Sequence, residues 1–280
     1  MRLGLALSGG GVRGIAHAGV LKALEENNIK IDVIGGTSAG SMVSSLYAMG
    51  YKPEEIFDCF KKNYNKIVKK SFFPFINEIR KVRQPLGGLK DGENIEEIFQ
   101  QLARNKNIEN INNIKMPIVI PTVDIVDAKQ YVFTNNIPKD DQKNNTYITD
   151  ISIGKAIRAS SSFPAMFNLC PINEHKFMDG GALNNVPVEE VKKQGADKVI
   201  AVKFDGDEIN EKSNMVDIVM RTIDIMGNKI IEEELKNSDY VLNIHTDKVG
   251  LFEVNKMEEC YMKGYETALE NMDKIRNICL

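Results

Sequence analysis

Histidine is scarce in this chain: its 280 residues include only His17, His175 and His245. Any mechanism that uses a histidine base or histidine metal ligands must therefore draw on these three positions. The four cysteines are widely separated and form no C-x-x-C pair, which argues against a zinc ribbon or a redox motif of that type. We predict no metal site and expect reduced thiols, as in a cytoplasmic protein.

Long apolar runs are also lacking. No stretch approaches the roughly 18 apolar residues of a membrane-spanning helix. The apolar run at residues 3–7 ends at a Ser-Gly-Gly-Gly turn, so no secretory signal peptide is predicted. Lys and Arg total 36 against 39 Asp and Glu, a net charge of −3, which argues against a dedicated nucleic-acid-binding protein. These features predict a cytoplasmic location.

One segment departs from this charge balance. Residues 61–90 contain nine Lys or Arg and one Glu, a net charge of +8, with three phenylalanines among them. Cations and interleaved rings suit an anionic lipid surface and indicate a transient, peripheral membrane contact. A solvated basic helix whose phenylalanines pack on the core explains the same composition. The candidate docking residues are Lys69, Lys70, Phe72, Phe73, Lys81 and Arg83.

Short apolar runs alternate with helical periodicity along most of the chain. Strands are predicted at residues 3–7, 31–34, 117–124, 130–133, 198–204 and 241–244. Helices are predicted at residues 14–27, 41–49, 153–159, 186–194, 214–236 and 256–276. This order predicts an α/β fold with a mostly parallel central sheet covered by helices. In the absence of repeats or linkers, we expect a single domain over residues 1–280 with a basic helical insertion or lid at about 55–115.

The first glycine-rich turn, Gly9-Gly10-Gly11-Val12-Arg13-Gly14, fits G-x-G-x-x-G between a predicted strand and a predicted helix. A dinucleotide site would need an acid at the end of the second strand, whereas Asp32 precedes that strand. Successive glycines let backbone N–H groups approach a ligand, and a helix N-terminus favours negative charge. The turn therefore suits a phosphate or the oxyanion of an acyl transfer, with Arg13 as a nearby cation.

The second turn, Gly36-Thr37-Ser38-Ala39-Gly40, matches the G-x-S-x-G nucleophile elbow between a predicted strand and a predicted helix. Ser38 could instead serve only as a helix N-cap. A serine nucleophile needs a base, and only His245 fits the hydrolase order Ser…Asp…His. A Ser38/His245 triad therefore remains one alternative.

A third turn, Asp179-Gly180-Gly181, follows a short predicted strand, where an aspartate can point into a cleft or simply form an ordinary turn. The three turns occur in order, and the sequence ASSSFPAMF at 159–167 lies before the last. Together these motifs resemble the patatin-like phospholipase family. The resemblance covers most of residues 1–205 and is weak elsewhere.

The resemblance implies a three-layer α/β/α fold and a serine lipid acyl hydrolase, of phospholipase A or lysophospholipase type, that needs no cofactor. Ser38 would be the nucleophile and Asp179 its only catalytic partner, with an acyl-enzyme intermediate. The residues implied to form the oxyanion hole are Gly9, Gly10, Gly11 and Arg13, and those supporting the motifs are Gly14, Gly36, Gly40, Gly180 and Gly181. A non-catalytic module that binds nucleotide or lipid through the first turn is the other alternative.

Overall fold

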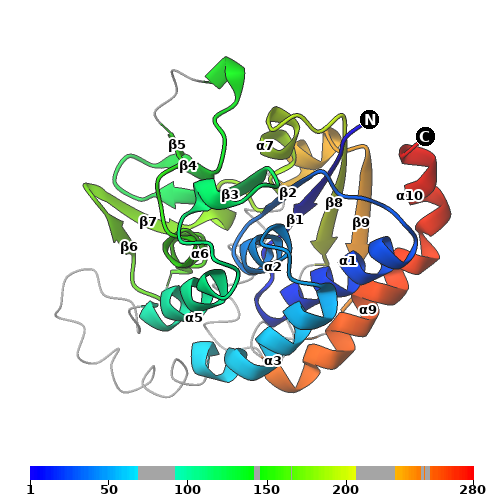
Figure 1. The fold of residues 1–280 in the computed structure, drawn as a ribbon, viewed down its shortest axis with the longest axis horizontal. Helices are drawn as coiled ribbons and strands as arrows, with labels where there is room; N and C mark the ends of the chain where they lie inside the picture. The colour runs from blue at the N-terminus through cyan, green and yellow to red at the C-terminus, as the bar shows by residue number, and fades with distance from the viewer. Residues whose placement is uncertain (69–91, 142–145, 165, 206–230, 247–248, 250–252) are drawn as a thin grey trace, which may run out of the picture.

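A mostly parallel sheet forms the centre of the computed structural model (Figure 1), with strand order β5-β4-β3-β2-β1-β8-β9. The structure describes the chain except residues 69–91, 142–145, 165, 206–230, 247–248 and 250–252. The parallel strands are β1 (Leu3–Leu7), β2 (Val33–Gly36), β3 (Ile118–Asp124), β8 (Lys198–Phe204) and β9 (Tyr240–Ile244). The hairpin strand β4 (Lys129–Thr134) is antiparallel to β3, and β5 (Tyr147–Ile148) pairs with it at the edge.

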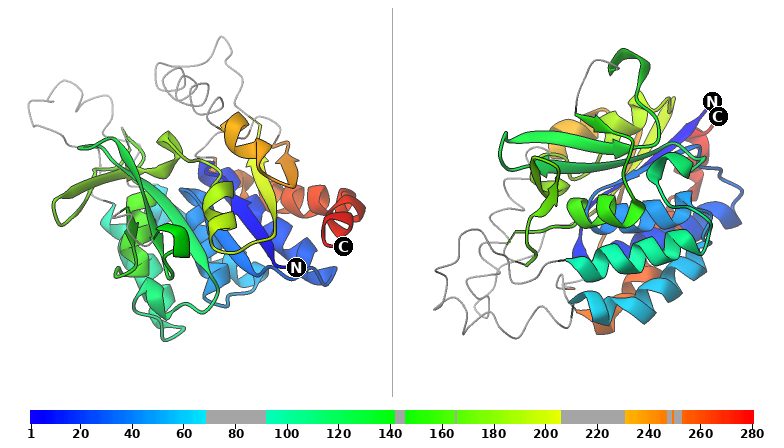
Figure 2. Two further views of the ribbon diagram at one scale, coloured as in Figure 1. Left: turned by 90° about the horizontal axis from the view of Figure 1, so that it is seen from above. Right: turned by 60° about the vertical axis from the view of Figure 1, so that its left-hand side comes forward.

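Helices cover both faces of this sheet (Figure 2). One face packs against α1 (Ala16–Glu26), α2 (Ala39–Ala48), α3 (Pro53–Val68), α5 (Glu93–Arg104), α6 (Ile153–Ser160) and α9 (Met257–Glu270). The other face is covered by α7 (Val188–Lys193) and helical residues 231–236. The α/β/α expectation is therefore confirmed.

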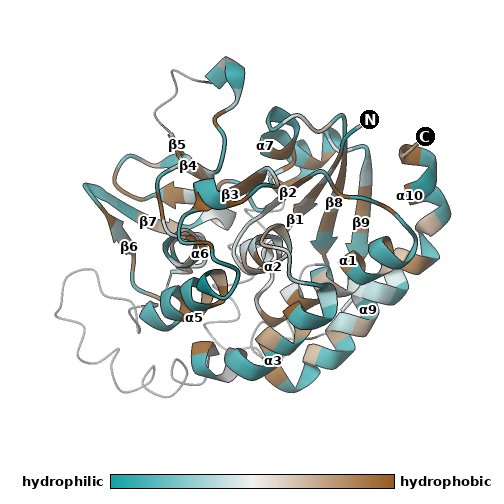
Figure 3. Cartoon of the chain, viewed as in Figure 1, coloured by the Kyte–Doolittle hydropathy of each residue, from teal (hydrophilic) through white to brown (hydrophobic). Residues whose placement is uncertain are grey.

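The side chains of β1 point alternately to the two faces of the sheet, and this explains the two apolar layers. Leu5 and Leu7 belong to the larger core cluster, whereas Ala6 belongs to the smaller one under α7. Successive side chains on a strand point to opposite faces, so a strand buried on both sides is apolar at every position. Figure 3 shows this concentration of hydrophobic residues on β1 and β2, and both strands are buried throughout.

The strand pairing of β3 brings two distant parts of the chain together. One edge of β3 is occupied by β4. Along its other edge, β2 pairs in parallel with Ile118 and Val119, and β7 (His175–Asp179) pairs antiparallel with Thr122 to Asp124. The carboxyl ends of β2 and β7 therefore face each other along β3. Gly35 lies opposite Val119 and Asp179 opposite Thr122, so these two residues are about 10 Å apart along β3.

Several elements differ from the sequence expectations. The predicted helix 256–276 is two helices, α9 and α10 (Met272–Ile278). They are separated at Asn271, whose side chain donates to Thr267 O and accepts from the Tyr240 hydroxyl. The strand β6 (Cys170–Ile172), which pairs with β7, was not predicted, because three residues are too few to show alternation.

The helices α3 and α5 make up most of the predicted insertion that the structure describes. Both contribute fully buried residues to the main core, including Ile56, Phe60 and Phe99. The six candidate docking residues, Lys69, Lys70, Phe72, Phe73, Lys81 and Arg83, lie outside the described residues. The single domain with a basic lid stays a prediction. No helix in the described part of the chain has the length and hydropathy needed to span a bilayer.

Candidate active site

Ser38 occupies a strained turn between β2 and α2. Its φ of 54° and ψ of −122° are uncommon for a residue with a side chain. The flanking glycines make the turn possible, since a Cβ on Gly36 would lie 2.3 Å from Gly40 O and one on Gly40 would lie 2.5 Å from Leu7 O. The Ser38 hydroxyl makes no capping hydrogen bond to α2. This geometry matches a nucleophile elbow and not a side-chain N-cap.

Asp179 ends β7 and is almost completely buried, with 4% of its surface exposed. Its Oδ1 accepts a 2.8 Å hydrogen bond from Gly181 N–H. Its Oδ2 is buried without a hydrogen-bond partner among the described residues. Because burial favours the neutral acid, the pKa of Asp179 rises from 3.8 to about 6. The nearby Ser38 hydroxyl and the Gly181 N–H partly offset this rise.

The end of α6 links the two candidate catalytic residues. Ser38 N–H donates to Ser160 Oγ at 3.1 Å, and Asp179 N–H donates to Ser162 O at 3.1 Å. Both serines are buried and belong to the 159–167 motif. A single helix end thus fixes the backbone of both the elbow and the aspartate.

The glycine-rich loop lies beside Ser38, but its N–H groups are not equivalent. The Gly9 N–H donates to Asn185 Oδ1 at 3.0 Å. The N–H groups of Gly10 and Gly11, at the start of a 3-10 helix (Gly11–Ile15), have no acceptor among the described residues. A Cβ on Gly9 would lie 3.1 Å from Ser38 Cβ, so the loop passes directly over Ser38.

The Arg13 side chain donates hydrogen bonds to backbone carbonyls of this loop and of the segment after β8. Its Nε donates to Gly10 O at 3.3 Å, and its Nη1 donates to Asp205 O at 3.2 Å. The guanidinium also lies over the Phe204 ring, 5.8 Å from its centroid. Arg13 was predicted as part of the oxyanion hole; its described contacts fix the Gly10 carbonyl.

None of the three histidines has a described hydrogen bond to Ser38 or Asp179. His245 is exposed and pairs with Asp205. His175 Nδ1–H donates to Asp124 Oδ2 at 2.6 Å, where β7 pairs with β3. His17 is fully buried, and its Nε2 lies 2.8 Å from Ser8 O. Burial lowers the pKa of His17 to about 4, so its ring is neutral at pH 7.

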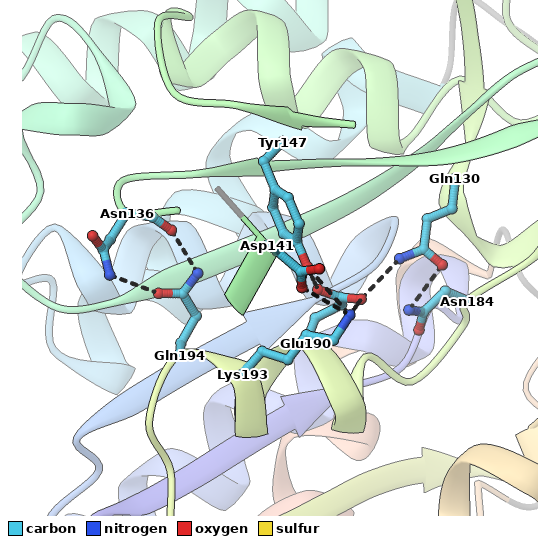
Figure 4. A network of polar contacts seen from close by, with 8 residues as sticks. All are labelled: Gln130, Asn136, Asp141, Tyr147, Asn184, Glu190, Lys193 and Gln194. Carbon is cyan, nitrogen blue, oxygen red and sulfur yellow. Dashed lines mark hydrogen bonds and ion pairs between the residues drawn. The ribbon is translucent and has the colours of Figure 1, made fainter. Parts of the chain in front are cut away.

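A network of polar side chains around α7 (Figure 4) is joined to the elbow through Asn184. Thr37 Oγ1 donates to Asn184 O at 2.8 Å, and Asn184 Nδ2 donates to Gln130 Oε1 at 3.2 Å. Gln130 reaches Glu190, a buried carboxylate of α7 that also accepts from the Tyr147 hydroxyl at 2.6 Å. These bonds join the elbow to β4, β5 and α7, which restricts movement of the Ser38 backbone.

Sequence reasoning missed two groups at this site. Asn185 holds the Gly9 N–H, and the only sequence signal for it is its position four residues after Gly181. The Ala39 N–H, directly after Ser38, has no acceptor among the described residues. In a G-x-S-x-G elbow this backbone group adds to the oxyanion hole, so the motif itself could have indicated it.

The fold and the site together define a class: α/β proteins with a serine elbow opposite a buried carboxylate. A family model described as patatin-like phospholipase matches residues 5–192, and the chain belongs to this family. It is 33% identical over 201 residues to Lysophospholipase NTE1 of Meyerozyma guilliermondii and 31% identical over 202 residues to Patatin-like phospholipase domain-containing protein 6 of Homo sapiens. These matches cover 71% of this chain but only 12% and 13% of those longer proteins.

Solved structures with a similar fold include VipD from Legionella pneumophila, with a TM-score of 0.52 and 14% identity. That match covers 97% of this chain and 66% of VipD. The type III effector protein ExoU matches with a TM-score of 0.50 and 15% identity, covering 98% of this chain and 53% of ExoU. At these identities the likeness concerns the fold alone.

Proposed function

We propose that this protein is a serine lipid acyl hydrolase that uses Ser38 as nucleophile and Asp179 as general base, without histidine. The observation that carries the proposal is the buried Asp179 carboxylate beside the hydroxyl of the elbow Ser38, with an Oδ2 that is hydrogen-bonded to no other described group. Burying a carboxylate oxygen with so few hydrogen-bond partners destabilises a fold, and such groups concentrate at functional sites.

The reaction proceeds in two halves. Asp179 Oδ2 takes the Ser38 hydroxyl proton while Ser38 Oγ attacks the ester carbonyl carbon. The tetrahedral intermediate collapses to an acyl-enzyme, and Asp179 gives the proton to the leaving alcohol oxygen. Water then attacks the acyl-enzyme, with its proton taken by Asp179 and returned to Ser38 Oγ as the fatty acid leaves.

Backbone N–H groups stabilise the negative charge that develops on the carbonyl oxygen. The candidates are the N–H groups of Gly10, Gly11 and Ala39, none of which is used by the described fold. Donors placed in advance cost no reorganisation during the reaction. The Gly9 N–H, by contrast, is held by Asn185.

The raised pKa of Asp179 makes the base suitable for work near neutral pH. An ordinary aspartate is a weak base towards a serine hydroxyl. With a pKa of about 6, Asp179 is a stronger base and is still mostly ionised at pH 7. The names of the relatives support a phospholipid or lysophospholipid as the substrate.

Lipid-product analysis tests this proposal. The wild-type protein is incubated with mixed phospholipid and lysophospholipid vesicles, and free fatty acid and the remaining lipid are quantified by mass spectrometry. Free fatty acid should accumulate with the wild type and be absent with Ser38→Ala. Equal release by both proteins would contradict the assignment of Ser38. No release by the wild type, with lipid bound, would favour a binding module.

His245→Ala separates the proposal from the histidine triad. We expect the variant to keep kcat for a short-chain ester within about twofold of wild type, because His245 is exposed and pairs with Asp205. A triad would lose at least about a thousandfold. Steady-state kinetics on the soluble ester distinguish the two, with Ser38→Ala giving the background rate.

A further inference from the structure

The peptide between Ser8 and Gly9 is held from both sides by side chains that have no part in the proposed proton transfers. The Ser8 carbonyl can only accept a hydrogen bond, so the neutral ring of His17 must carry its proton on Nε2 and donate it there, at 2.8 Å. The Gly9 N–H of the same peptide donates to Asn185 Oδ1 at 3.0 Å. A trans peptide directs its carbonyl and its N–H to opposite sides, and the two partners sit on those two sides.

The Gly10 carbonyl, two residues further along the loop, is also fixed. Arg13 N–H and Arg13 Nε both donate to Gly10 O, at 3.2 and 3.3 Å. Because the Gly10–Gly11 peptide is trans, its N–H points away from Arg13. The two anchored peptides thus determine the direction of the unused Gly10 and Gly11 N–H groups.

His17 and Asn185, the two side chains that hold the Ser8–Gly9 peptide, are themselves packed against other parts of the fold. The buried His17 ring packs on Phe204 with centroids 4.8 Å apart, and a Cβ on Gly10 would lie 2.6 Å from that same Phe204 ring. Asn185 Oδ1 lies close to Gly181, in the turn that follows Asp179: a Cβ added to Gly181 would be 3.1 Å from this oxygen. His17 therefore ties the loop to β8, and Asn185 ties it to the turn that carries Asp179.

We propose that His17 and Asn185 are positioning residues that hold the Ser8–Gly9 peptide from opposite sides and so, together with the anchor of Arg13 on Gly10 O, aim the Gly10 and Gly11 N–H groups at the reacting oxyanion. This inference rests on the proposed function. It gives the buried histidine a role other than that of a base, and it accounts for an asparagine that the proposed chemistry leaves unused. Neither side chain needs to touch the substrate.

Kinetics of Asn185→Ala and His17→Phe on a soluble short-chain ester test the proposal. Each should lower kcat by about 10- to 100-fold while KM stays within about twofold, since the lost interaction acts mainly in the transition state. Inhibition by a trifluoromethyl ketone, which forms an oxyanion on the serine, should weaken by a similar factor. A purely structural role would lower the melting temperature without this matched loss.

Asn185→Asp is the conservative variant, because it keeps the oxygen that accepts from Gly9. We expect its kcat at the optimal pH to stay within about fivefold of wild type. The acidic limb of its pH profile should move to higher pH, because the added carboxylate stands beside the Asp179 turn. The matched control is Leu183→Ala, an exposed residue of the same segment, which should leave kcat unchanged.

The outcomes separate the two proposals. Unchanged kcat in folded Asn185→Ala and His17→Phe, with Ser38→Ala and Asp179→Asn inactive, would overturn the positioning role alone. Wild-type turnover in Ser38→Ala would overturn the proposed function. If Asn185→Ala fails to fold, Asn185→Asp still decides the matter, since a kcat loss above tenfold in that folded variant would contradict the acceptor role.

Discussion

Replacing Asp179 by Asn is expected to lower kcat for ester hydrolysis by about 10⁴-fold or more, as much as replacing Ser38 by Ala. The amide keeps an oxygen for the Gly181 N–H but offers no base at the Oδ2 position. The Ser38 hydroxyl would then have no described group to receive its proton. Single-turnover and steady-state rates with a chromogenic short-chain ester measure the loss.

The double variant provides an internal test of this pairing. If Ser38 and Asp179 act as one unit, the double variant Ser38→Ala, Asp179→Asn should lose no more kcat than either single variant. Asp124→Asn is the matched control, because Asp124 is also a buried carboxylate at a strand end but is fully engaged by His175, Val126 and Lys176. A kcat for Asp179→Asn close to that of Asp124→Asn would contradict the role of Asp179.

The same substitution, Asp179→Asn, is expected to stabilise the fold at neutral pH while it abolishes activity. The pKa of Asp179 is about 6 in the folded protein and 3.8 for an ordinary aspartate, so the folded state binds this proton more tightly. The contribution of Asp179 to the free energy of unfolding is therefore greatest below about pH 4, and it falls as pH rises through 6. Well above pH 6 the ionised, buried carboxylate lowers the free energy of unfolding by up to about 3 kcal/mol.

Urea unfolding at several pH values checks this expectation. Asp179→Asn should exceed the wild type in free energy of unfolding at pH 8, and the difference should shrink towards zero near pH 4. Ser38→Ala serves as the control, because it also inactivates the protein but leaves the carboxyl in place. A difference that is independent of pH would show that ionisation of Asp179 is not its cause.

Much of the fold follows from local sequence signals. The strand at 3–7 and the strand at 198–204 were predicted with their observed bounds, because a short run made up mostly of apolar residues between turn residues is a strong local pattern. Ser38 and Asp179 were singled out because each belongs to a turn whose glycines are required locally. The structure brings both turns to the same edge of β3.

The missed features depend on contacts between distant segments. Asn185 meets Gly9 across 176 positions of sequence, and nothing local distinguishes it from other asparagines in turns. The burial of His17 was equally undecidable from the spacing of apolar residues in its helix. Arg13 was predicted as part of the oxyanion hole, and whether its guanidinium contacts a ligand or a backbone carbonyl is decided by tertiary packing alone.

The meeting of β2 and β7 along one edge of β3 has a consequence for how this family can vary. The separation of the proposed nucleophile and base is set mainly by the residues of β3 between Val119 and Thr122. Connections outside β3 and outside the end of α6, which holds Ser38 N–H and Asp179 N–H, can therefore gain or lose residues without altering that separation. A deletion of one residue inside β3 would turn its partners to the wrong face. Substrate preference can thus diversify in the connections while the spacing of the reactive pair is inherited unchanged.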